Sequence, residues 1–544
     1  MDAVSPKSRP EILNCQLVPT IWRVSSIGSN SGGQLGLGND IDQYSPEPAL
    51  FRADSSQNSN AIYVPSCIAD LANSSPPIIV GGGNHSVLYW KGLPLLFGCG
   101  SNADGELPFE LLSNISRVQS NVWSPLNIPS EDQIIDAKLV SSNSLCNECD
   151  PNQTKVKVCQ VSLGWNHSLL LSTSGRVYSC GNNKFGQLGY NNVSKNAEFS
   201  LVFIDQNLKT PLKNVSRISS GLRHNLALTA DNLLFGWGSN SHNQIGVPNN
   251  STLGKKISKF IDCPTSIPIS GKIVSISCGR HHSAWISTSF HSNNLRYVSG
   301  DVSKDESCHE LCDPGISLGV LNNSNSESGN QIRSKFKINS ESNNLSIGNS
   351  CLPMLGIAGK SKVKSQIDLL SNGVINQVQY TNYPLNDLIP LKGYSPHENI
   401  YLCSSWDCLF ILIKVPKSDI FNVYGYGSNM FGLLGDSNLS TESSVLDSSS
   451  ISNLDGCKIN SLSSPKPLIS DINTLACGSY HAVSLSCIAS PAVSCWGWNE
   501  HGNCNSKPCQ SVWPPNAIEI KDDLVHEIFS IGAGYGNTFV VYKA

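Results

Sequence analysis

The sequence predicts an all-β protein, a seven-bladed β-propeller that is closed by its two terminal segments and interrupted by long loop insertions. Three observations support this prediction. Helical periodicity is nearly absent, and short β-rich runs are separated by turns drawn from 44 Gly, 29 Pro and many Ser and Asn residues. Two glycine-containing half motifs alternate along the whole chain. The two chain ends carry complementary halves of one repeat.

The first half motif is Gly-x-x-His, and the second is Gly-x-Asn-x-x-Gly. The first half lies at 82–85, 164–167, 221–224, 279–282 and 478–481, with altered copies at 404–407 and 534–537. The second half lies at 28–33, 100–105, 181–186, 427–432 and 497–502; the copy at 238–243 ends in Asn243, and Gly300 keeps only the first position. From His167 to His224 is 57 residues and from His224 to His282 is 58. A period this regular indicates one supersecondary unit repeated seven times.

Residues 159–189 show the unit most clearly. A strand leads into Gly164 and His167, the apolar run Leu169–Leu170–Leu171 forms a second strand, and Gly175 allows a turn. A third strand follows, and Gly181 and the glycines after it mark a tight corner. Such a sheet buries its faces only against neighbours of its own kind.

The other blades are assigned in order. Three of them cover 78–108, 159–189 and 215–246. The next begins at Ile273 and loses its pattern after Val298. Another covers 399–435, and the last has its corner at 492–505. Residues 39–77 read as a polar loop, and 109–157 and 436–465 read as insertions. Residues 301–396 are rich in Ser and Asn and are expected to form a long flexible insertion. Residues 1–19 are expected to be an N-terminal tail, and 20–544 a single propeller.

The terminal segments complete one another. Residues 20–38 hold a second half motif with no first half before it, and 527–543 hold a first half with nothing after it. We therefore predict that Ile27 and Val540 lie in the same sheet, which removes the open edges of the array.

Composition narrows the possible functions. Charged residues are 14% and the formal net charge is −4, which argues against broad electrostatic binding to nucleic acid or acidic membranes. No secretory signal and no membrane-length apolar run is seen. The 20 cysteines are then expected to be reduced, and the chain to be cytoplasmic and also nuclear.

The repeated histidines suggest metal binding or catalysis, but one histidine per blade places them around a ring, where they cannot converge on a metal ion. We interpret them as half-buried imidazoles that fix their own blades, and the corner glycines as turn residues. This structural set is His85, His167, His224, His282, His481, Gly100, Gly181, Gly238, Gly427 and Gly497. Cys146 and Cys149 form half a zinc site and are read as reduced thiols, so no metal or other cofactor is expected.

The motif pair, with the extended form Tyr/Trp-Gly-x-Asn-x-x-Gly-Gln-Leu-Gly, resembles the regulator of chromosome condensation repeat. The corner from Cys495 to Cys504 is similar to the branch that contains the secretion-regulating guanine nucleotide exchange factor. The resemblance implies a seven-bladed propeller that acts on, or beside, a small GTPase. Exchange makes and breaks no covalent bond, and no Walker loop or nucleophile elbow is present, so we expect no bond-making active site and no catalytic residue.

The corner after β-rich residues 492–495 supplies the candidate partner-binding residues Trp496, Trp498, Asn499, Glu500 and His501, which combine aromatic and charged groups. The alternative is a purely structural corner with tryptophan packed between blades. The chain is expected to be a monomer that binds a small GTPase or another protein, without direct nucleic-acid contact or membrane insertion.

Two other functions stay open. The same branch contains a yeast propeller linked to tRNA wobble-uridine modification and diphthamide synthesis, which implies a non-catalytic scaffold that pairs with a small metalloprotein. A chromatin-associated exchange factor for the nuclear-transport GTPase is disfavoured by the acidic net charge and the lack of a basic tail. An ultraviolet receptor is disfavoured because the tryptophans fall at different repeat positions.

Overall fold

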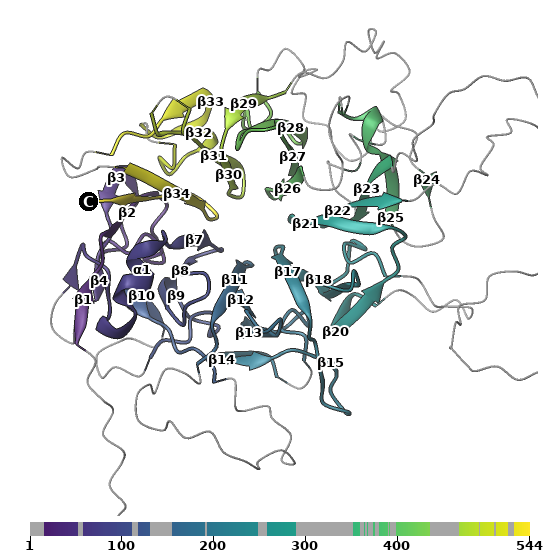
Figure 1. Cartoon of the computed structure of the whole chain (residues 1–544), viewed down its shortest axis with the longest axis horizontal. Helices are drawn as coiled ribbons and strands as arrows, with labels where there is room; N and C mark the ends of the chain where they lie inside the picture. Colours follow the sequence, from purple (N-terminus) through teal and green to yellow (C-terminus); the bar gives the residue numbers. More distant parts are fainter. Residues whose placement is uncertain are drawn as a thin grey trace, which may run out of the picture. The chain divides into compact units, whose positions relative to one another are not determined.

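Seven sheets, each with four antiparallel strands, follow one another around a common axis in the computed structural model (Figure 1). The structure describes residues 16–52, 58–110, 118–130, 155–190, 193–247, 258–289, 352–359, 364, 367, 374–375, 380–389, 391, 399–435, 467–488, 490–504, 507–520 and 527–544. The sheets belong to one compact unit, Met1–Ser289 with Leu352–Ala544, whereas the second unit, Phe290–Cys351, lies outside the described residues.

We number the blades in chain order and name the strands of each from the inside outward. Blade 1 is β7 (Ile78–Gly81), β8 (His85–Tyr89), β9 (Leu96–Ser101) and β10 (Gln119–Pro125), extended by β4 (Phe51–Arg52) and β5 (Asn58–Ser59). Blade 2 is β11 (Val158–Leu163), β12 (His167–Ser172), β13 (Val177–Asn182) and β14 (Lys195–Leu201); blade 3 is β17 (Val215–Ser220), β18 (His224–Thr229), β19 (Leu234–Ser239) and β20 (Phe260–Ile267).

Blade 4 is β21 (Lys272–Cys278), β22 (His282–Ser289), β23 (Leu352–Gly359) and β25 (Tyr380–Pro384), with β24 (Val374–Ile375) outside. Blade 5 is β26 (Ile400–Ser404), β27 (Cys408–Lys414), β28 (Phe421–Gly427) and β29 (Ile469–Ile472); blade 6 is β30 (Thr474–Cys477), β31 (His481–Ser486), β32 (Ala492–Asn499) and β33 (Cys509–Ala517). Blade 7 is β34 (Glu527–Ala533), β35 (Asn537–Lys543), β2 (Trp22–Gly28) and β3 (Gln43–Pro48).

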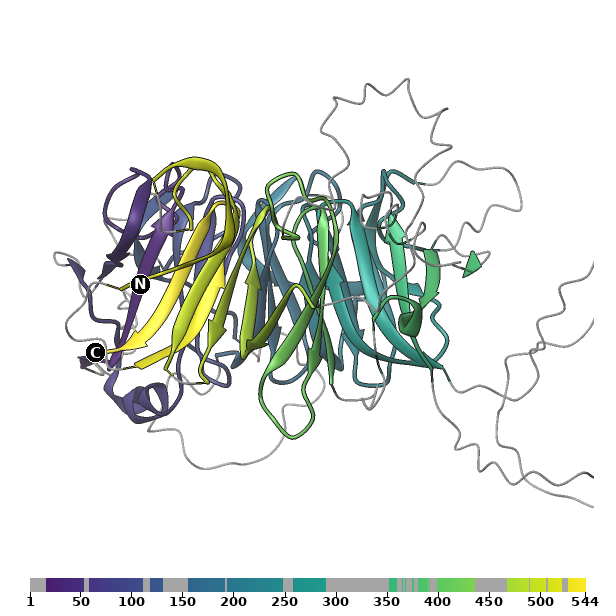
Figure 2. The same ribbon diagram turned by 90° about the horizontal axis from the view of Figure 1, so that it is seen from above.

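The innermost strands close a circle. In order, each of β7, β11, β17, β21, β26, β30 and β34 packs against the next, and β34 packs against β7. The predicted terminal pairing is confirmed, because β2 pairs with β35 from Trp22 opposite Lys543 to Gly28 opposite Asn537. Ile27 and Val540 therefore lie in one sheet. Purple β2 beside the yellow C-terminal strands shows this closure in both views (Figures 1 and 2).

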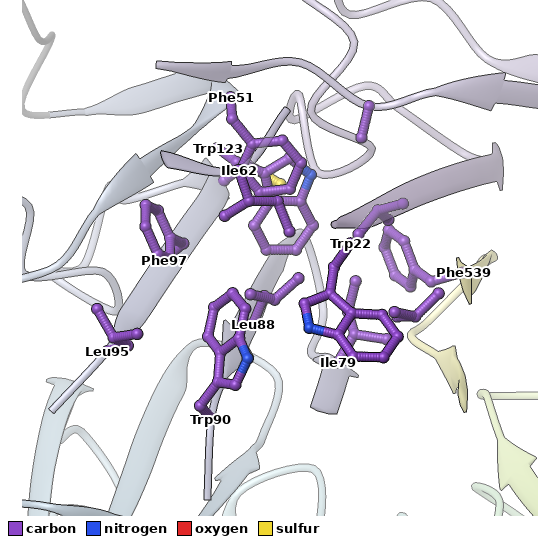
Figure 3. Close-up of a cluster of buried hydrophobic side chains, with 14 of the residues drawn as sticks. Trp22, Phe51, Ile62, Ile79, Leu88, Trp90, Leu95, Phe97, Trp123 and Phe539 are labelled. Carbon is purple, nitrogen blue, oxygen red and sulfur yellow. The ribbon is translucent and has the colours of Figure 1, made fainter. Parts of the chain in front are cut away.

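The seam between blades 7 and 1 holds the largest aromatic core (Figure 3). Trp22 and Phe539 of blade 7 meet Trp90, Phe97 and Trp123 of blade 1, all nearly inaccessible to solvent. The indole nitrogens of Trp22 and Trp90 both donate hydrogen bonds to the carbonyl oxygen of Ala72, at 2.8 and 2.9 Å. These two indole N–H groups are therefore satisfied, whereas the buried Nε1 of Trp123 has no hydrogen-bond partner among the described atoms.

The span 39–77 is more ordered than the predicted polar loop. It contains β6 (Tyr63–Pro65), a 3-10 turn at Ser66–Ile68 and α1 (Ala69–Ser74), and Phe51, Ile62 and Val64 from this span are fully buried in the seam core. The expected tail is also shorter than predicted at its C-terminal end, because β1 (Leu17–Pro19) pairs with β6. Only a few apolar residues among many polar ones take part, which is why hydropathy did not reveal this layer.

Blade 4 corrects the predicted insertion. Residues 352–359 and 380–384 lie within the expected span 301–396, yet β23 pairs with β22 along its whole length and β25 pairs with β23. Leu355, Ile357 and Tyr383 are fully buried. The described part of this span is therefore blade structure, and the flexibility predicted for the remainder falls outside the described residues.

The corner glycine of blade 4 is Gly359 rather than Gly300. In blade 3, His224 pairs with Gly238, whose φ is +102°, and a Cβ there would lie 2.5 Å from the carbonyl oxygen of Arg223. In blade 4, His282 pairs in the same way with Gly359, at φ +103°. The predicted corner glycines Gly100, Gly181, Gly238, Gly427 and Gly497 all have positive φ between +99° and +127°. Their conformation supports their interpretation as turn residues.

Candidate functional site: the face formed by the Gly-x-x-His loops

The seven loops that join the first and second strands of the blades surround one end of the axis. In each loop the residue after the motif glycine donates its backbone N–H to a carbonyl in the next loop, over 2.9–3.4 Å. The seven bonds run from Gly83 to Gly164, Trp165 to Leu222, Leu222 to Gly279, Arg280 to Trp406, Trp406 to Ser479, Ser479 to Tyr535 and Tyr535 to Gly82. This circle of bonds fixes the loops relative to one another, so side chains that leave it are held on a rigid base.

A cavity of about 100 Å³ lies inside this circle and is lined by loops of all seven blades. Three aromatic side chains from distant blades meet at its rim. Trp165 of blade 2 lies 4.8 Å from Tyr535 of blade 7 and 5.9 Å from Trp406 of blade 5, and Trp406 lies 4.5 Å from Tyr535, measured between ring centroids. These contacts span the axis, and therefore the three rings cover the inner end of the face.

Five aromatic rings form a closed circuit on this face. Trp406 contacts Tyr480 at 5.5 Å, Tyr480 contacts Phe431 at 5.2 Å, and Phe431 contacts Trp498 at 6.3 Å. Trp498 contacts Tyr535 at 6.0 Å, and the contact of Tyr535 with Trp406 closes the circuit. All five side chains are half-buried. The centres of protein interfaces are enriched in aromatic residues, so a contiguous, partly exposed aromatic cluster is typical of a binding surface. We call this set the aromatic circuit.

A positional rule explains how the sequence builds the face. In four of the described loops, the second variable residue of the Gly-x-x-His motif meets the residue just before the last position of the preceding blade's Gly-x-Asn-x-x-Gly corner. The observed pairs are Asn166 with Asp104, Arg223 with Phe185, His281 with His242 and Tyr480 with Phe431. Neither position is needed for the turn itself, since the glycines, asparagine and histidine supply the framework. The face is therefore where blades can differ without loss of the fold.

The repeat histidines were predicted to be half-buried imidazoles that fix their own blades, and the structure shows a different arrangement. All five are fully buried rather than half-buried, and four of them join neighbouring blades rather than fixing their own, whereas both ring nitrogens of His282 lack a hydrogen-bond partner among the described atoms. His85 Nε2 lies 3.1 Å from Ser168 Oγ, and His167 Nε2 lies 2.8 Å from Asn225 Oδ1. His224 binds Ser283, and His481 binds the carbonyl of Asn537. In each case the partner belongs to the next blade.

The protonation state of these imidazoles follows from their partners and burial. Ser168 Oγ donates to the carbonyl of Glu106, so it must accept the hydrogen bond from His85 Nε2. Burial is the main cause that lowers the pKa of His85 and His224 to about 3 and that of His167, His282 and His481 to about 4. The set is neutral at pH 7, with its donor hydrogen on Nε2 wherever the partner is an obligate acceptor.

Blade 5 departs from the repeat in a way that also shifts its register. The altered copy predicted at 404–407 lies at 405–408, because Cys408, and not Asp407, pairs with the corner glycine Gly427. In other loops a Cβ on the motif glycine would collide with the imidazole, for example at 2.0 Å from His167 Cε1 for Gly164. Cys408 has no ring, which allows Ser405 at the glycine position.

The structure divides the five predicted partner-binding residues into two groups. Trp496 is wrongly assigned to the surface, because it is fully buried between blades 5 and 6 and donates its indole N–H to the carbonyl of Leu433 at 3.0 Å. Asn499 is also buried, and its Oδ1 accepts the backbone N–H of Cys504 at 2.8 Å, which closes the corner. Trp498 and His501 are half-buried and Glu500 is exposed.

Trp498 and His501 lie next to the closing seam. Their rings meet edge to face at 5.1 Å, and His501 Nδ1 lies 2.7 Å from a carboxylate oxygen of Asp42 in the N-terminal segment. Trp406, Tyr480, Tyr535 and Arg280 are further candidate residues that sequence reasoning missed. The signal for Trp406 was present: at the corrected register it occupies the loop position of Trp165.

One buried carboxyl on this face gives a test of the repeat framework. Glu106, 4% exposed, stands where blades 2 and 3 have Gln187 and Gln244, and its Oε2 accepts the backbone N–H of Asp104 at 2.8 Å. Burial raises the pKa of Glu106 to about 7, above its unfolded value near 4.5. Its contribution to stability is therefore fully present below pH 4.5 and is lost as the pH rises through 7.

We expect Glu106→Gln to stabilise the protein at pH 8.5 by up to about 3 kcal/mol, because the variant keeps the acceptor and removes the buried charge. Urea unfolding at pH 6 and pH 8.5 should show an advantage that grows with pH. The matched reverse change, Gln187→Glu, should destabilise the protein at pH 8.5. Equal stability of Glu106→Gln and the unchanged protein at pH 8.5 would contradict the assignment.

No group of three or more metal-ligating side chains is found among the residues that the structure describes. Cys146 and Cys149 lie outside these residues. A search of the described helices likewise finds none that is long and apolar enough to cross a membrane.

Comparison with known proteins agrees with this architecture. Two models of the regulator of chromosome condensation repeat match residues 158–187 and 215–244, and residues 174–228 and 231–286. The matched residues lie in blades 2 and 3 and the first two strands of blade 4, so the chain is similar to these repeats over that part, and its described sheets form a seven-bladed β-propeller.

Among individual relatives, the chain is similar to the mouse secretion-regulating guanine nucleotide exchange factor, with 24% identity over 94% of this chain and 82% of the mouse protein. It is 36% identical to the Arabidopsis thaliana ultraviolet-B receptor, over 23% of this chain and 26% of the receptor.

Two solved structures share the fold. Human WBSCR16 covers 96% of this chain and all of its own, with a TM-score of 0.54 and 14% identity; Prp20p of Saccharomyces cerevisiae covers 97% and 93%, with a TM-score of 0.53 and 16% identity.

Proposed function

We propose that this propeller recognises a small GTPase through the face of the Gly-x-x-His loops and promotes exchange of its guanine nucleotide. The observation that carries the proposal is the aromatic circuit, a half-exposed set of five rings on a hydrogen-bonded base. Tyrosine and tryptophan are the residues that contribute most to binding energy in protein interfaces. Their concentration on one face favours protein recognition as the activity.

Nucleotide exchange requires a recognition surface and no bond-making chemistry, and the aromatic face is a surface of this kind. An exchange factor accelerates release by binding the nucleotide-free GTPase more tightly than the loaded one, and the difference in affinity drives the change. A rigid surface suits this task, because it does not adapt equally well to both states. The circle of backbone hydrogen bonds under the aromatic circuit supplies such rigidity.

The relatives support the same choice. The mouse relative is named as a secretion-regulating guanine nucleotide exchange factor, and the structure of Prp20p is described with its binding properties to Gsp1p and histones. We extend the exchange activity, and a role in secretion, to this chain as part of the proposal. We also propose that it acts as a monomer in the cytoplasm and nucleus, where thiols such as those of Cys99 and Cys180 stay reduced and donate to neighbouring carbonyls.

The test begins with affinity capture from extract of the source cells and continues with release of a fluorescent guanine nucleotide from each GTPase recovered. We expect the chain to accelerate release, and Trp498→Ala to reduce the acceleration at least about tenfold, as loss of an aromatic anchor does in protein interfaces. Lys91→Ala is the matched control, because Lys91 is exposed in the turn after β8, at the opposite end of the blade.

Thermal unfolding should show that Trp498→Ala remains folded, since Trp498 is only half-buried. Recovery of a small zinc protein with no GTPase would overturn the proposal in favour of the scaffold alternative. Equal release rates with Trp498→Ala and with Lys91→Ala would leave exchange in place but remove it from this face.

A further inference from the structure

The Gly-x-x-His face has a second region beside the aromatic circuit, with a different chemical character. It consists of Arg223, His242, Arg280 and His281 from blades 3 and 4, and we call these four residues the basic sector. All are half-buried. The whole chain has a net charge of −4, so two arginines and two imidazoles in adjoining loops are a local departure from its composition.

Both guanidinium groups lie over aromatic rings. Arg223 Cζ is 4.6 Å from the centroid of Phe185, and Arg280 Cζ is 4.9 Å from that of Trp406, a member of the aromatic circuit. Stacking holds a guanidinium by its flat face and leaves the N–H groups at its edge free for an acceptor. The two arginines are therefore positioned before any partner arrives.

These arginines lack a carboxylate partner within the described part of the chain. The ion pairs found there, at 4.0 Å or less, are Lys155 with Glu110, Lys414 with Asp419 and His501 with Asp42. The carboxylate of Asp407 accepts the hydroxyl of Tyr480 at 2.7 Å, and the side chain of Arg280 also forms a hydrogen bond with Tyr480. In addition, Nε of Arg280 is buried without a hydrogen-bond partner among the described atoms.

The two histidines of the basic sector reflect the electrostatics of this region. The rings of His242 and His281 stack at 4.1 Å with an angle of 27° between their planes. The pKa of His281 is lowered to about 4, first by burial and then by His242 and Arg280, with a smaller effect of Arg223; Asp407 acts in the opposite direction. His281 is thus neutral at pH 7, and further positive charge is unfavourable here. A negative group would relieve the repulsion.

We infer that the basic sector binds carboxylate side chains of an acidic segment of the partner protein, while the adjoining aromatic circuit takes apolar side chains of the same segment. The inference rests on the proposed function, since it concerns the same face, and it specifies the chemistry of the partner. Charge complementarity supports it, because the planar guanidinium edge matches a carboxylate through two parallel hydrogen bonds. Asp104 and Glu500 elsewhere on the face, and Asp407 beside the basic sector, disfavour an extended polyanion such as nucleic acid.

The experiment uses the full chain and a fluorescein-labelled peptide of four Glu-Glu-Leu repeats, followed by fluorescence anisotropy. The neutral comparison peptide has four Gln-Gln-Leu repeats. We expect the acidic peptide to bind at least about tenfold more tightly than the neutral one, with an affinity that falls as salt increases. The double variant Arg223→Gln with Arg280→Gln should reduce binding of the acidic peptide by at least about tenfold.

Arg217→Gln is the matched control. Arg217 lies on β17 and donates to the carbonyl of Val274, away from the loops, so its loss should leave peptide binding unchanged. Equal binding of the acidic and neutral peptides, or unchanged binding by the double variant, would overturn the inference. Competition by millimolar inorganic phosphate would identify a general anion site and would also overturn it.

Two further readouts separate this inference from the proposed function and from self-association. Sedimentation of the unchanged chain should show no dimer; a dimer lost in the double variant would make a second copy the occupant and overturn the inference. Nucleotide release that depends on Trp498 but is unchanged in the double variant would keep the proposed function while rejecting an acidic partner segment.

Discussion

Below pH 6.5 the propeller is expected to lose stability steeply. The unfolded chain binds protons on its histidines in this range, whereas the five buried histidines of the folded protein stay neutral. Each has an unfolded pKa near 6.5 and a folded pKa of about 3 or 4. A lowered folded pKa gives stability that is present above pH 6.5 and lost as the pH falls toward 4. Each histidine contributes about 1.4 kcal/mol per pH unit in this window, so five together give about 7 kcal/mol per pH unit.

Urea unfolding at half-unit pH steps from 7.5 to 4.5 measures this slope. His481→Gln is the informative variant, because an amide can still donate to the carbonyl of Asn537 but does not titrate. Its stability should depend less steeply on pH than that of the unchanged protein. A stability that is constant between pH 6.5 and 5 would contradict the neutral, buried state of the histidines.

Trp22→Ala is expected to destabilise the protein by about 3–5 kcal/mol, since Trp22 is 3% exposed and fills the seam where the N-terminal strand closes the propeller. Its ring meets Phe529 edge to face at 4.9 Å, and its N–H satisfies the carbonyl of Ala72 together with Trp90. Chemical denaturation gives the change in the free energy of unfolding.

Ile41→Ala is a suitable control, because Ile41 belongs to the same N-terminal segment but is 64% exposed. It should change stability by less than about 0.5 kcal/mol. A cost for Trp22→Ala below about 1 kcal/mol would show that the closing strand is not held by the seam core, and would place the two terminal segments apart.

The fold could be predicted because the repeat encodes it redundantly. Gly181 and Gly238, at positive φ, stand opposite His167 and His224, and the same relation recurs around the propeller. Failures occurred where one copy lost its marker. At Cys408 the motif histidine is absent, and the predicted register was therefore wrong by one residue. After Ser289 an insertion separates β22 from its partner strand β23 in the sequence.

The candidate site could be predicted only in part. Trp498 and His501 were identified from the composition of their corner, but the same corner also placed buried Trp496 and Asn499 in the set. Tyr480 and Tyr535 were missed, because their significance depends on contacts between blades that are far apart in the sequence. A repeat motif shows which positions are free to vary, whereas only the closed propeller shows which of them meet.

Hydrogen exchange of the chain, alone and bound to the GTPase recovered by affinity capture, tests the central claim most directly. We expect protection of backbone amides in the Gly-x-x-His loops, especially 405–408, 478–481 and 534–537, with little change in the opposite turns at 90–93, 173–175 and 230–232. Protection confined to those opposite turns would contradict recognition through the aromatic face.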